Sequence, residues 1–196
     1  MPFDFLLAGV GGQGTILAGD ILAEAGVNAG FEVKKSEVHG MAQRGGGVES
    51  HVRWGTRVYS PLVEMGRANF LVAFEMLEGA RWAGYLAPGA LAIVNRYRQP
   101  PLSVSLGQQR YPGVAEVEVL FSGRRLWWVD ATGVARRLGN PAVAGVVLLG
   151  ALSTCLPVEP ECWVEAIERL VPPRHVAINR QAFEAGRALP AEARPS

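Results

Sequence analysis

The sequence of 196 residues is poor in cysteine, in net charge and in long hydrophobic runs. Its two cysteines, Cys155 and Cys162, cannot supply the four ligands of a structural zinc site or an iron–sulfur cluster. They form no C-x-x-C pair, so a redox dithiol is not expected either. We therefore predict that this chain holds no metal and that any metal chemistry coupled to it belongs to another chain.

The formal net charge of +1 gives no field that would attract nucleic acid or an anionic membrane. The start, Met1-Pro2-Phe3-Asp4, lacks the basic region of a signal peptide. The longest apolar run, Ala142 to Leu152, is 11 residues long, whereas a membrane-spanning helix needs about 20. We expect a soluble, cytoplasmic protein that binds neither nucleic acid nor membrane.

What the sequence does contain is enough apolar material for a sizeable core, with 49% hydrophobic and 19% charged residues. Its length fits one domain, because domains commonly have about 100–200 residues. No linker or internal repeat divides the chain. We expect one domain over residues 1–188, followed by a frayed tail over 189–196.

A glycine-rich turn near the start organises the chain. Gly9-Val10-Gly11-Gly12-Gln13-Gly14 lies between an apolar strand, Phe3 to Ala8, and an amphipathic helix that begins at Thr15. Glycines allow a sharp turn and bring backbone N–H groups close to a ligand, and the positive end of the helix dipole favours an anion there. The alternative is a tight turn that only packs the helix on the sheet.

The strand expected over Phe31 to Val38 bears on the nature of such a ligand. A dinucleotide site usually has an acidic residue at the end of this strand. Here Lys34 and Lys35 stand in that region, with Glu32 and Glu37 on either side of them. This weakens the case for NAD, although either lysine could meet a phosphate.

A second glycine-rich loop runs from His39 to Gly47 and includes Gln43, Arg44, Gly45 and Gly46. An arginine beside glycines can bind a phosphate or carboxylate through two parallel hydrogen bonds. Alternatively, Arg44 bonds neighbouring carbonyls and fixes the loop. His39 could transfer a proton near neutral pH, or serve as a structural hydrogen-bonding residue at a strand end.

Alternating residues predict a strand over Val48 to Trp54, followed by a turn at Gly55-Thr56 and a hairpin partner over Arg57 to Ser60. His51 and Arg53 fall on the polar face of this strand, which we expect to be the wetter one.

The middle of the chain has the pattern of a parallel crossover. We expect buried strands over 70–74 and 91–95, a helix over 75–85 and a turn at Pro88-Gly89. Glu75 and Asn95 follow the carboxyl ends of these strands, where ligands of open α/β sheets bind. Helix capping or loop fixing is the alternative role for each.

The rest of the chain supplies two strands and then helices. We expect a short strand over 116–121, a last strand over 126–131 with Trp127 and Trp128 on opposite faces, and helices that begin near Asn140, Pro160 and Pro173. The almost wholly apolar helix over 142–152 must be covered by its own domain or by another subunit. The predicted architecture is a single three-layer α/β/α domain with a Rossmann-like, mostly parallel sheet, a β-hairpin and a helical C-terminus.

Both glycine loops, taken in order, resemble those of a known family. The first loop with its Ala-rich helix, and the second loop around Gln43-Arg44-Gly45-Gly46, resemble the gamma-type domain of 2-oxoacid:ferredoxin oxidoreductases. Asn140 with Leu149-Gly150, and Asn179 with Ala182-Phe183 and Gly186, resemble its C-terminal pattern. Ser36 to Gly47, Tyr59-Ser60-Pro61 and Phe74 to Arg81 look most like the indolepyruvate branch, in its beta subunit.

The resemblance implies a division of labour. A large partner subunit would carry thiamine diphosphate and [4Fe–4S] clusters and decarboxylate an aryl 2-oxoacid oxidatively, passing electrons to ferredoxin and the acyl group to coenzyme A. The small chain would bind no cofactor alone and would help to shape the active-site entrance and the approach of coenzyme A. Purified without its partner, it could form a homodimer.

Within that division of labour, the two glycine loops would face the partner or its ligand. Gly11, Gly12 and Gly14 would supply N–H donors, Gln13 an amide and Arg44 a positive charge. The sequence offers no convincing nucleophile with a paired base, so no catalytic residue is assigned. Two alternatives remain: a stand-alone NAD(P)- or FAD-binding protein, and a purely structural assembly subunit.

Overall fold

The structure, a computed structural model, describes residues 2–39 and 46–189. A six-stranded sheet with the order β2-β3-β1-β4-β5-β6 forms its centre. The strands are β1 (Phe3–Val10), β2 (Glu32–His39), β3 (Gly47–Gly55), β4 (Ala68–Ala73), β5 (Leu86–Asn95) and β6 (Arg125–Val129). β1, β4, β5 and β6 run parallel to one another, whereas β3 pairs antiparallel with both β1 and β2. The expected mostly parallel sheet is confirmed.

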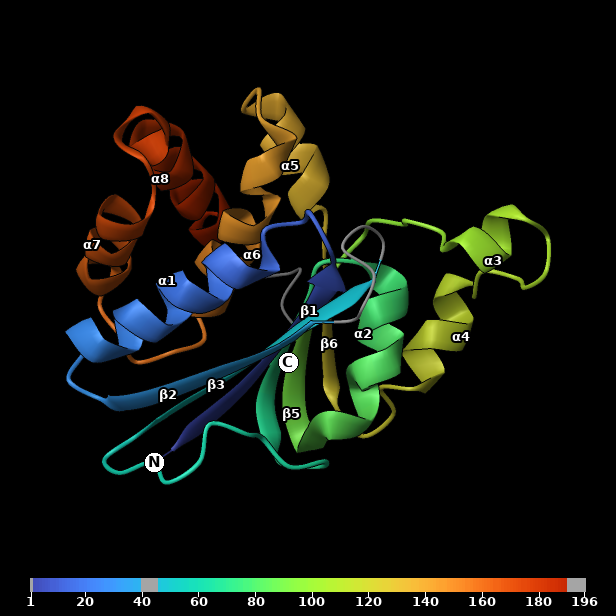
Figure 1. The fold of residues 1–196 in the computed structure, drawn as a ribbon, viewed down its shortest axis with the longest axis horizontal. Helices are drawn as coiled ribbons and strands as arrows, with labels where there is room; N and C mark the ends of the chain where they lie inside the picture. Colours follow the sequence, from blue (N-terminus) through green and yellow to red (C-terminus); the bar gives the residue numbers. More distant parts are fainter. Residues whose placement is uncertain (1, 40–45, 190–196) are drawn as a thin grey trace.

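Helices cover both faces of this sheet, which gives the three expected layers (Figure 1). The helices are α1 (Thr15–Asn28), α2 (Met76–Trp82), α3 (Leu102–Ser105), α4 (Val114–Val119), α5 (Ala131–Arg137), α6 (Ala144–Ser153), α7 (Pro160–Leu170) and α8 (Pro173–Arg187), with short 3-10 turns at Ala83–Tyr85 and Pro141–Val143. One core cluster joins α1, α5, α6, α7 and α8 to the sheet, and α2 and α4 contribute to a second cluster on the other face. No helix within the described ranges is long and apolar enough to cross a membrane.

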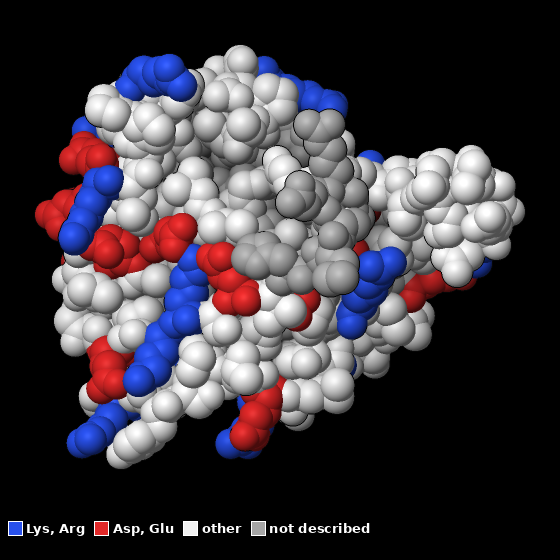
Figure 2. Space-filling model, in the orientation of Figure 1, with Lys and Arg blue, Asp and Glu red and all other residues white. Residues whose placement is uncertain are grey.

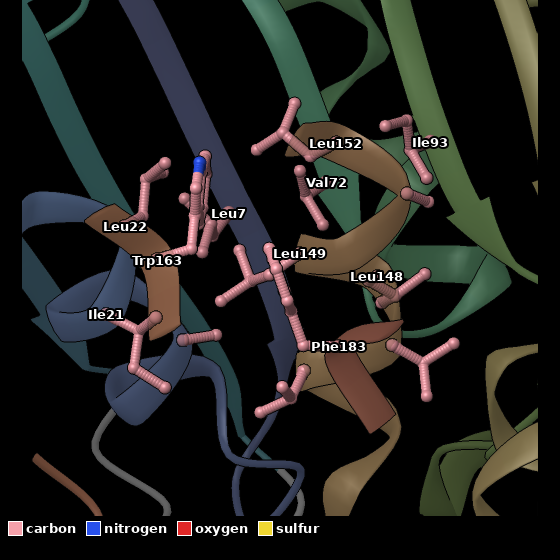
Figure 3. Packing of buried hydrophobic residues seen from close by; sticks show 14 of the residues in the cluster. Leu7, Ile21, Leu22, Val72, Ile93, Leu148, Leu149, Leu152, Trp163 and Phe183 are labelled. Carbon is pink, nitrogen blue, oxygen red and sulfur yellow. The ribbon is translucent and has the colours of Figure 1, made fainter. Parts of the chain in front are cut away.

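The apolar helix α6 is buried by its own domain. Figure 3 shows Leu148, Leu149 and Leu152 of this helix among apolar side chains of the sheet and of α7 and α8. Every residue from Gly145 to Ser153 is buried. Of the two coverings that the sequence left open, the structure therefore shows the intramolecular one.

The crossing of α6 and α8 depends on two glycines. A Cβ added at Gly150 would overlap the carbonyl oxygen of Phe183, and one added at Gly186 would overlap that of Val147. Only residues without a side chain let the two helix backbones approach this closely. This close contact explains why glycine stands at Gly150 and Gly186, two residues of the C-terminal pattern described above.

Two expected strands are wrong. Residues 57–60 form no strand, and β3 finds its hairpin partner in β2 instead. Residues 114–119 form α4, although their alternation of valine and glutamate resembles a strand. Glu116 Oε2 accepts a hydrogen bond from Gly113 N at 2.7 Å, which caps the helix and overrides the alternation.

Two further expectations need correction. Pro88-Gly89 does not precede the strand but lies inside β5, where Gly89 has φ 72° and the register with β4 shifts. His51 is not on a wet face, because the segment after β3 covers it and Val63 N donates to its Nδ1 at 3.1 Å. Its burial lowers the pKa of His51 below the ordinary value.

The adjacent tryptophans do face opposite layers, as expected. Trp127 is buried in the core cluster that includes α6, while Trp128 packs on the other cluster and donates its Nε1 to Glu118 of α4 at 3.0 Å. α4 thus covers part of the Trp128 side chain. Beyond it, α3 and α4 form a lobe that projects from the molecule (Figure 1).

Candidate functional site

A cavity of about 430 Å³ opens where the parallel strands end. Its lining residues are Gly11, Gly12, Gln13, Phe74, Asn95, Tyr97, Gln99, Thr132, Arg136, Pro141, Ala142 and Ala144. They follow β1, β4 and β6, lie at or just after the end of β5, or belong to the turn and the first residue of α6. β1 connects through α1 to β2 on one side of it, while β4 lies on its other side, so the cavity sits at the switch point where open α/β sheets bind ligands.

The glycine turn is held largely by its own hydrogen bonds. Gly11 N donates to Gly46 O at 3.0 Å, and Gln13 N donates to Val10 O at 3.1 Å. Gln13 Oε1 accepts from Val10 N at 2.9 Å. The expectation that Gly11 offers its N–H to a ligand is therefore wrong, since a backbone carbonyl already occupies that donor.

The other glycines of the turn have different reasons to be glycine. Gly12 and Gly14 have φ of 96° and 80°, which side chains rarely tolerate. Gly9 is extended, but an added Cβ would overlap Thr15 Oγ1 and approach Phe74. Gly9 thus serves the packing of the turn against α1 and β4, whereas Gly12 faces the cavity.

The two glycine loops meet where Gly11 N donates to Gly46 O and where Val10 pairs with Gly47 at the ends of β1 and β3. His39 ends β2, but its side chain, together with all of Gln43, Arg44 and Gly45, lies outside the described residues. The ligand-facing role expected of these four therefore stays a prediction.

The two lysines do not line this cavity. Both lie on β2, at the edge of the sheet. Lys35 forms ion pairs with Asp20 of α1 and with Glu37, and Lys34 is placed opposite Arg53 of β3. Arg53 itself forms a two-pronged contact with Asp4 at 2.7 and 3.1 Å. The phosphate contact considered for the lysines has no support from this geometry.

Asn95 lines the cavity, but its amide is engaged in holding the end of β5. Its Nδ2 donates to Phe74 O at 3.0 Å and to Thr132 Oγ1 at 2.9 Å, and its Oδ1 accepts from Ala131 N at 3.1 Å. These bonds join the ends of β4, β5 and β6. Asn95 therefore fixes the floor of the cavity, in line with the loop-fixing alternative.

Glu75 does not line the cavity but contacts Gln99, which does. It caps α2, because its Oε2 accepts from Leu77 N at 2.6 Å and from Glu78 N at 3.0 Å. Its Oε1 accepts from Gln99 N at 3.0 Å and from the Tyr111 hydroxyl. Burial, followed by the bond to Glu75, raises the pKa of Tyr111 above its ordinary value.

This arrangement connects Glu75 to the glycine turn. Gln13 Nε2 donates to Gln99 Oε1 at 3.0 Å, and Gln99 is held at its backbone by Glu75. The segment that follows β5 is thus tied to α2 and to the turn after β1. It forms one wall of the cavity.

The two remaining asparagines have structural bonds. Asn140 Oδ1 accepts from Ala142 N at 3.1 Å, which fixes the turn that carries Pro141 and Ala142 into the cavity wall. Asn179 is buried in α8 and donates its Nδ2 to His175 O at 2.8 Å. Only Asn140 contributes to the site, through the backbone that it caps.

Sequence reasoning missed four polar residues of the lining: Tyr97, Gln99, Thr132 and Arg136. Tyr97 and Gln99 stand just after β5, and Thr132 and Arg136 are four residues apart on α5, so they share one helix face. Their position after the strand ends was the available signal.

A second cavity, of about 380 Å³, lies between β3 and α2 and has a different chemistry. Gly47, Glu49, Glu78, Arg81, Trp82 and Tyr85 line it. Burial, and then the charge of Glu78, raises the pKa of Glu49, and burial is the main cause that raises the pKa of Glu78. Arg81 compensates in part, since its Nη1 donates to Glu78 Oε1 at 3.0 Å.

Metal ligands do not gather in the part of the chain that the structure describes, where no group of three or more His, Cys, Asp or Glu side chains is placed to hold an ion.

Comparison with known proteins decides the family. The family model of pyruvate ferredoxin/flavodoxin oxidoreductase matches residues 4–189. The chain belongs to this family. Indolepyruvate oxidoreductase subunit IorB from Pyrococcus horikoshii is 39% identical, and that from Thermococcus kodakarensis 38%, each over 94% of both chains.

Solved structures of family members agree with the fold. The gamma subunit of a keto/oxoacid ferredoxin oxidoreductase from Geobacter sulfurreducens superimposes with a TM-score of 0.69 at 27% identity. The match covers 94% of this chain and 95% of that subunit. The resemblance noted in the two glycine loops thus extends over the whole fold of an oxidoreductase subunit.

Proposed function

We propose that this chain is the small subunit of an indolepyruvate:ferredoxin oxidoreductase. In this role it supports the coenzyme A-dependent oxidative decarboxylation of aryl 2-oxoacids, with ferredoxin as the electron acceptor. The observation that carries the proposal is the near full-length similarity to two indolepyruvate oxidoreductase subunits.

The geometry supports a helper rather than an independent catalyst. The polar groups around the cavity, Asn95, Gln13 and Gln99 among them, are bonded to one another and hold strand ends in place. Such a set gives shape and fixed donors to a surface. The chain would thereby complete the active-site entrance of a larger partner.

Iron–sulfur clusters do not fit this chain, because it has two cysteines and a cluster needs four thiolate ligands. We assign the [4Fe–4S] clusters and thiamine diphosphate to the large subunit, with coenzyme A as co-substrate and ferredoxin reached through the complex. A chain separated from this partner could form a homodimer and would have no turnover.

The proposal is tested by reconstitution with the large subunit from the same organism. We expect indole-3-pyruvate- and coenzyme A-dependent reduction of ferredoxin only when both chains are present, and slower turnover with pyruvate or 2-oxoglutarate. Equal turnover by the large subunit alone would refute the proposal. Preference for pyruvate would retain the family and reject the indolepyruvate assignment.

Arg44, which stands outside the described residues, remains the proposed positive charge of the second glycine loop. In the reconstituted complex, Arg44→Ala should lower kcat/KM for the oxoacid or coenzyme A by the loss of one charge-assisted contact, about 1.5–3 kcal/mol. Size-exclusion chromatography would show whether the complex still assembles. Unchanged kinetics in an intact complex would rule out this role, and a loss of assembly alone would favour the purely structural subunit.

A further inference from the structure

The strand β2 has one open side. In the part of the chain that the structure describes, β2 pairs with β3 alone and ends the sheet (Figure 1). The N–H and C=O groups on its other side therefore have no strand partner, and such an edge is a template for pairing with a further strand. β2 contains no proline and balances its two lysines with two glutamates, so neither proline nor a uniform charge protects this edge.

The order of charges along β2 is complementary to itself in one antiparallel register. A two-fold axis normal to the sheet keeps the α1 sides of two copies together, so opposed residues must come from the same face of the strand. With the axis at Ser36, Lys35 of each copy lies opposite Glu37 of the other. The exposed Val38 then lies opposite Lys34, whose aliphatic stem can cover it.

Neighbouring registers are unfavourable. An axis at Lys34, Lys35 or Glu37 would oppose two like charges directly, which destabilises a strand pair. An axis at Val33 or Val38 would pair only a short end of the strand. The charges of β2 therefore select the register centred on Ser36.

Helix α1 adds an apolar flank to the same edge. Four of its residues recur at helical spacing and fall on one line along the helix: Ile16, Asp20, Ala23 and Val27. Asp20 forms an ion pair with Lys35, so this line lies beside β2. Ile16 and Val27 are exposed, as is Val38 on the strand itself. Exposed apolar side chains thus accompany the open strand edge.

We propose that two copies of this chain associate through β2 and α1, with their β2 strands paired antiparallel about Ser36. The two sheets join into one continuous sheet, and the α1 helices pack against each other along the line from Ile16 to Val27. The same surface serves in both copies, so the contact closes after two chains. This goes beyond the proposed oxidoreductase role, because the surface belongs to this chain and needs no large subunit.

The test begins with the mass of the purified full chain, measured by light scattering after size-exclusion chromatography. We expect a dimer. Lys35→Glu and Glu37→Lys each oppose like charges twice, and each should weaken the dimer by about tenfold to a hundredfold. An equimolar mixture of the two variants should dimerise again, because each reversed charge then meets an opposite charge.

Recovery in the mixture separates a lost dimer contact from a folding defect. Both variants lose the ion pair between Lys35 and Glu37 within one chain, and mixing cannot restore that pair. Circular dichroism of each variant alone should show the wild-type helix content.

Ser36→Cys tests the register without changing a charge. Opposed Cα atoms of an antiparallel pair are about 4.5–5.5 Å apart, within the range of about 4.4–6.8 Å that a disulfide spans. Mild oxidation should therefore link two copies of this variant. Lys34→Cys is the control on the same strand, because in this register its two copies are about 14 Å apart. The wild type controls for the native thiols of Cys155 and Cys162.

The helix flank is tested by a charge at an exposed valine. Val27→Asp should weaken the dimer, because it places a carboxylate in the contact between the two α1 helices. Val119→Asp is the matched control, since Val119 is also an exposed valine near the end of a helix but lies on α4. It should leave the mass of the dimer unchanged.

A monomeric wild-type chain would overturn the inference, including the case in which only the large subunit pairs with β2. So would a dimer that both charge variants leave intact, or equal cross-linking of the Ser36 and Lys34 variants. The outcome is independent of the reconstitution described above. A dimeric chain that is dispensable for turnover would keep this surface and lose the proposed function, and a monomeric chain that is essential for turnover would do the opposite.

Discussion

Glu75 combines burial with an unusually complete set of partners. The residue is 1% exposed, and its carboxylate accepts hydrogen bonds from two backbone groups of α2, from Gln99 N and from Tyr111. An amide in its place would turn an N–H group toward two of these donors. A buried donor without an acceptor lowers the stability of the folded state. The Glu75 carboxylate therefore holds α2 and the wall of the cavity together.

We predict that Glu75→Gln lowers the free energy of unfolding by about 1–3 kcal/mol. Urea denaturation followed by circular dichroism measures this loss. Glu184→Gln, at an exposed position of α8, is the control and should change stability by less than about 0.5 kcal/mol. A variant at Glu75 as stable as this control would show that its bonds contribute little.

Single residues of the site were partly predictable. The glycine turn, Glu75 and Asn95 could be placed because each follows a buried strand, and parallel strands end at one edge of the sheet. Their roles were harder to infer, since Gly11 N and the Asn95 amide are used by neighbouring backbone that the sequence does not place beside them. Arg136 was missed because it is four residues beyond Thr132 on a helix, not in a loop.

At the level of elements, α6 and α8 contact each other through glycine at both sides of their crossing. Gly150 faces the backbone of Phe183, and Gly186 faces that of Val147. A methyl group at either position cannot move aside, because rigid helix backbone opposes it. The spacing of the two helices is therefore fixed by the absence of side chains.

We expect Gly150→Ala to destabilise the chain by roughly 2–4 kcal/mol, as overpacking of a tight interface does. Gly84→Ala is the matched control, since a Cβ at Gly84 would meet nothing within 4 Å. Thermal unfolding of the two variants beside the wild type makes the comparison. Similar melting temperatures for both variants would mean that α6 and α8 can move apart without a loss of stability.

The contact between β3 and α2 makes the stability of the folded chain depend on pH. Glu49 faces Glu78, with Arg81 of α2 as the compensating cation and His51 on the same strand. The folded-state pKa of Glu49 is raised above the ordinary 4.5, so the folded chain binds this proton more tightly than the unfolded chain. The resulting stabilisation is complete below pH 4.5 and is lost as the pH rises through the folded-state pKa.

Glu49→Gln, which imitates the protonated side chain, should therefore raise the melting temperature at pH 8 and leave it nearly unchanged at pH 4. Differential scanning calorimetry at the two pH values tests this. Glu184→Gln serves again as the exposed control, with no such dependence. A larger gain at pH 4 than at pH 8 would contradict the sign of the shift.

Elements were predictable where hydrophobic periodicity agreed with local chemistry, as in α1, α7 and the buried strands β1 and β4. They were missed where the two disagreed. In residues 114–119 the capping of Gly113 N by Glu116 decides for a helix against the alternating pattern. The strand partner of β3 was missed because β2 is separated from β3 by the second glycine loop. The segment after Gly55 is nearer in the sequence, but it only covers His51.

For the whole molecule, charge gives little guidance to partners. On the face shown in Figure 2, basic and acidic side chains are interspersed, in keeping with a net charge of +1. Membership of an oxidoreductase family together with two cysteines points instead to a separation of roles between chains. This agrees with the proposed assignment of the electron carriers to the large subunit.

We predict that iron and thiamine analysis of the native complex finds both with the large subunit. After mild separation of the chains, the small chain should contain less than one iron per molecule, and the large chain should keep its brown colour. Iron retained by the small chain after removal of its partner would contradict the assignment.

The first strand of the chain lies in the interior of the sheet, between β3 and β4. During synthesis it must therefore wait for partners that leave the ribosome later, first residues 47–55 and then 68–73. A shortened amino terminus would divide the sheet into a two-stranded and a three-stranded remnant rather than trim an edge.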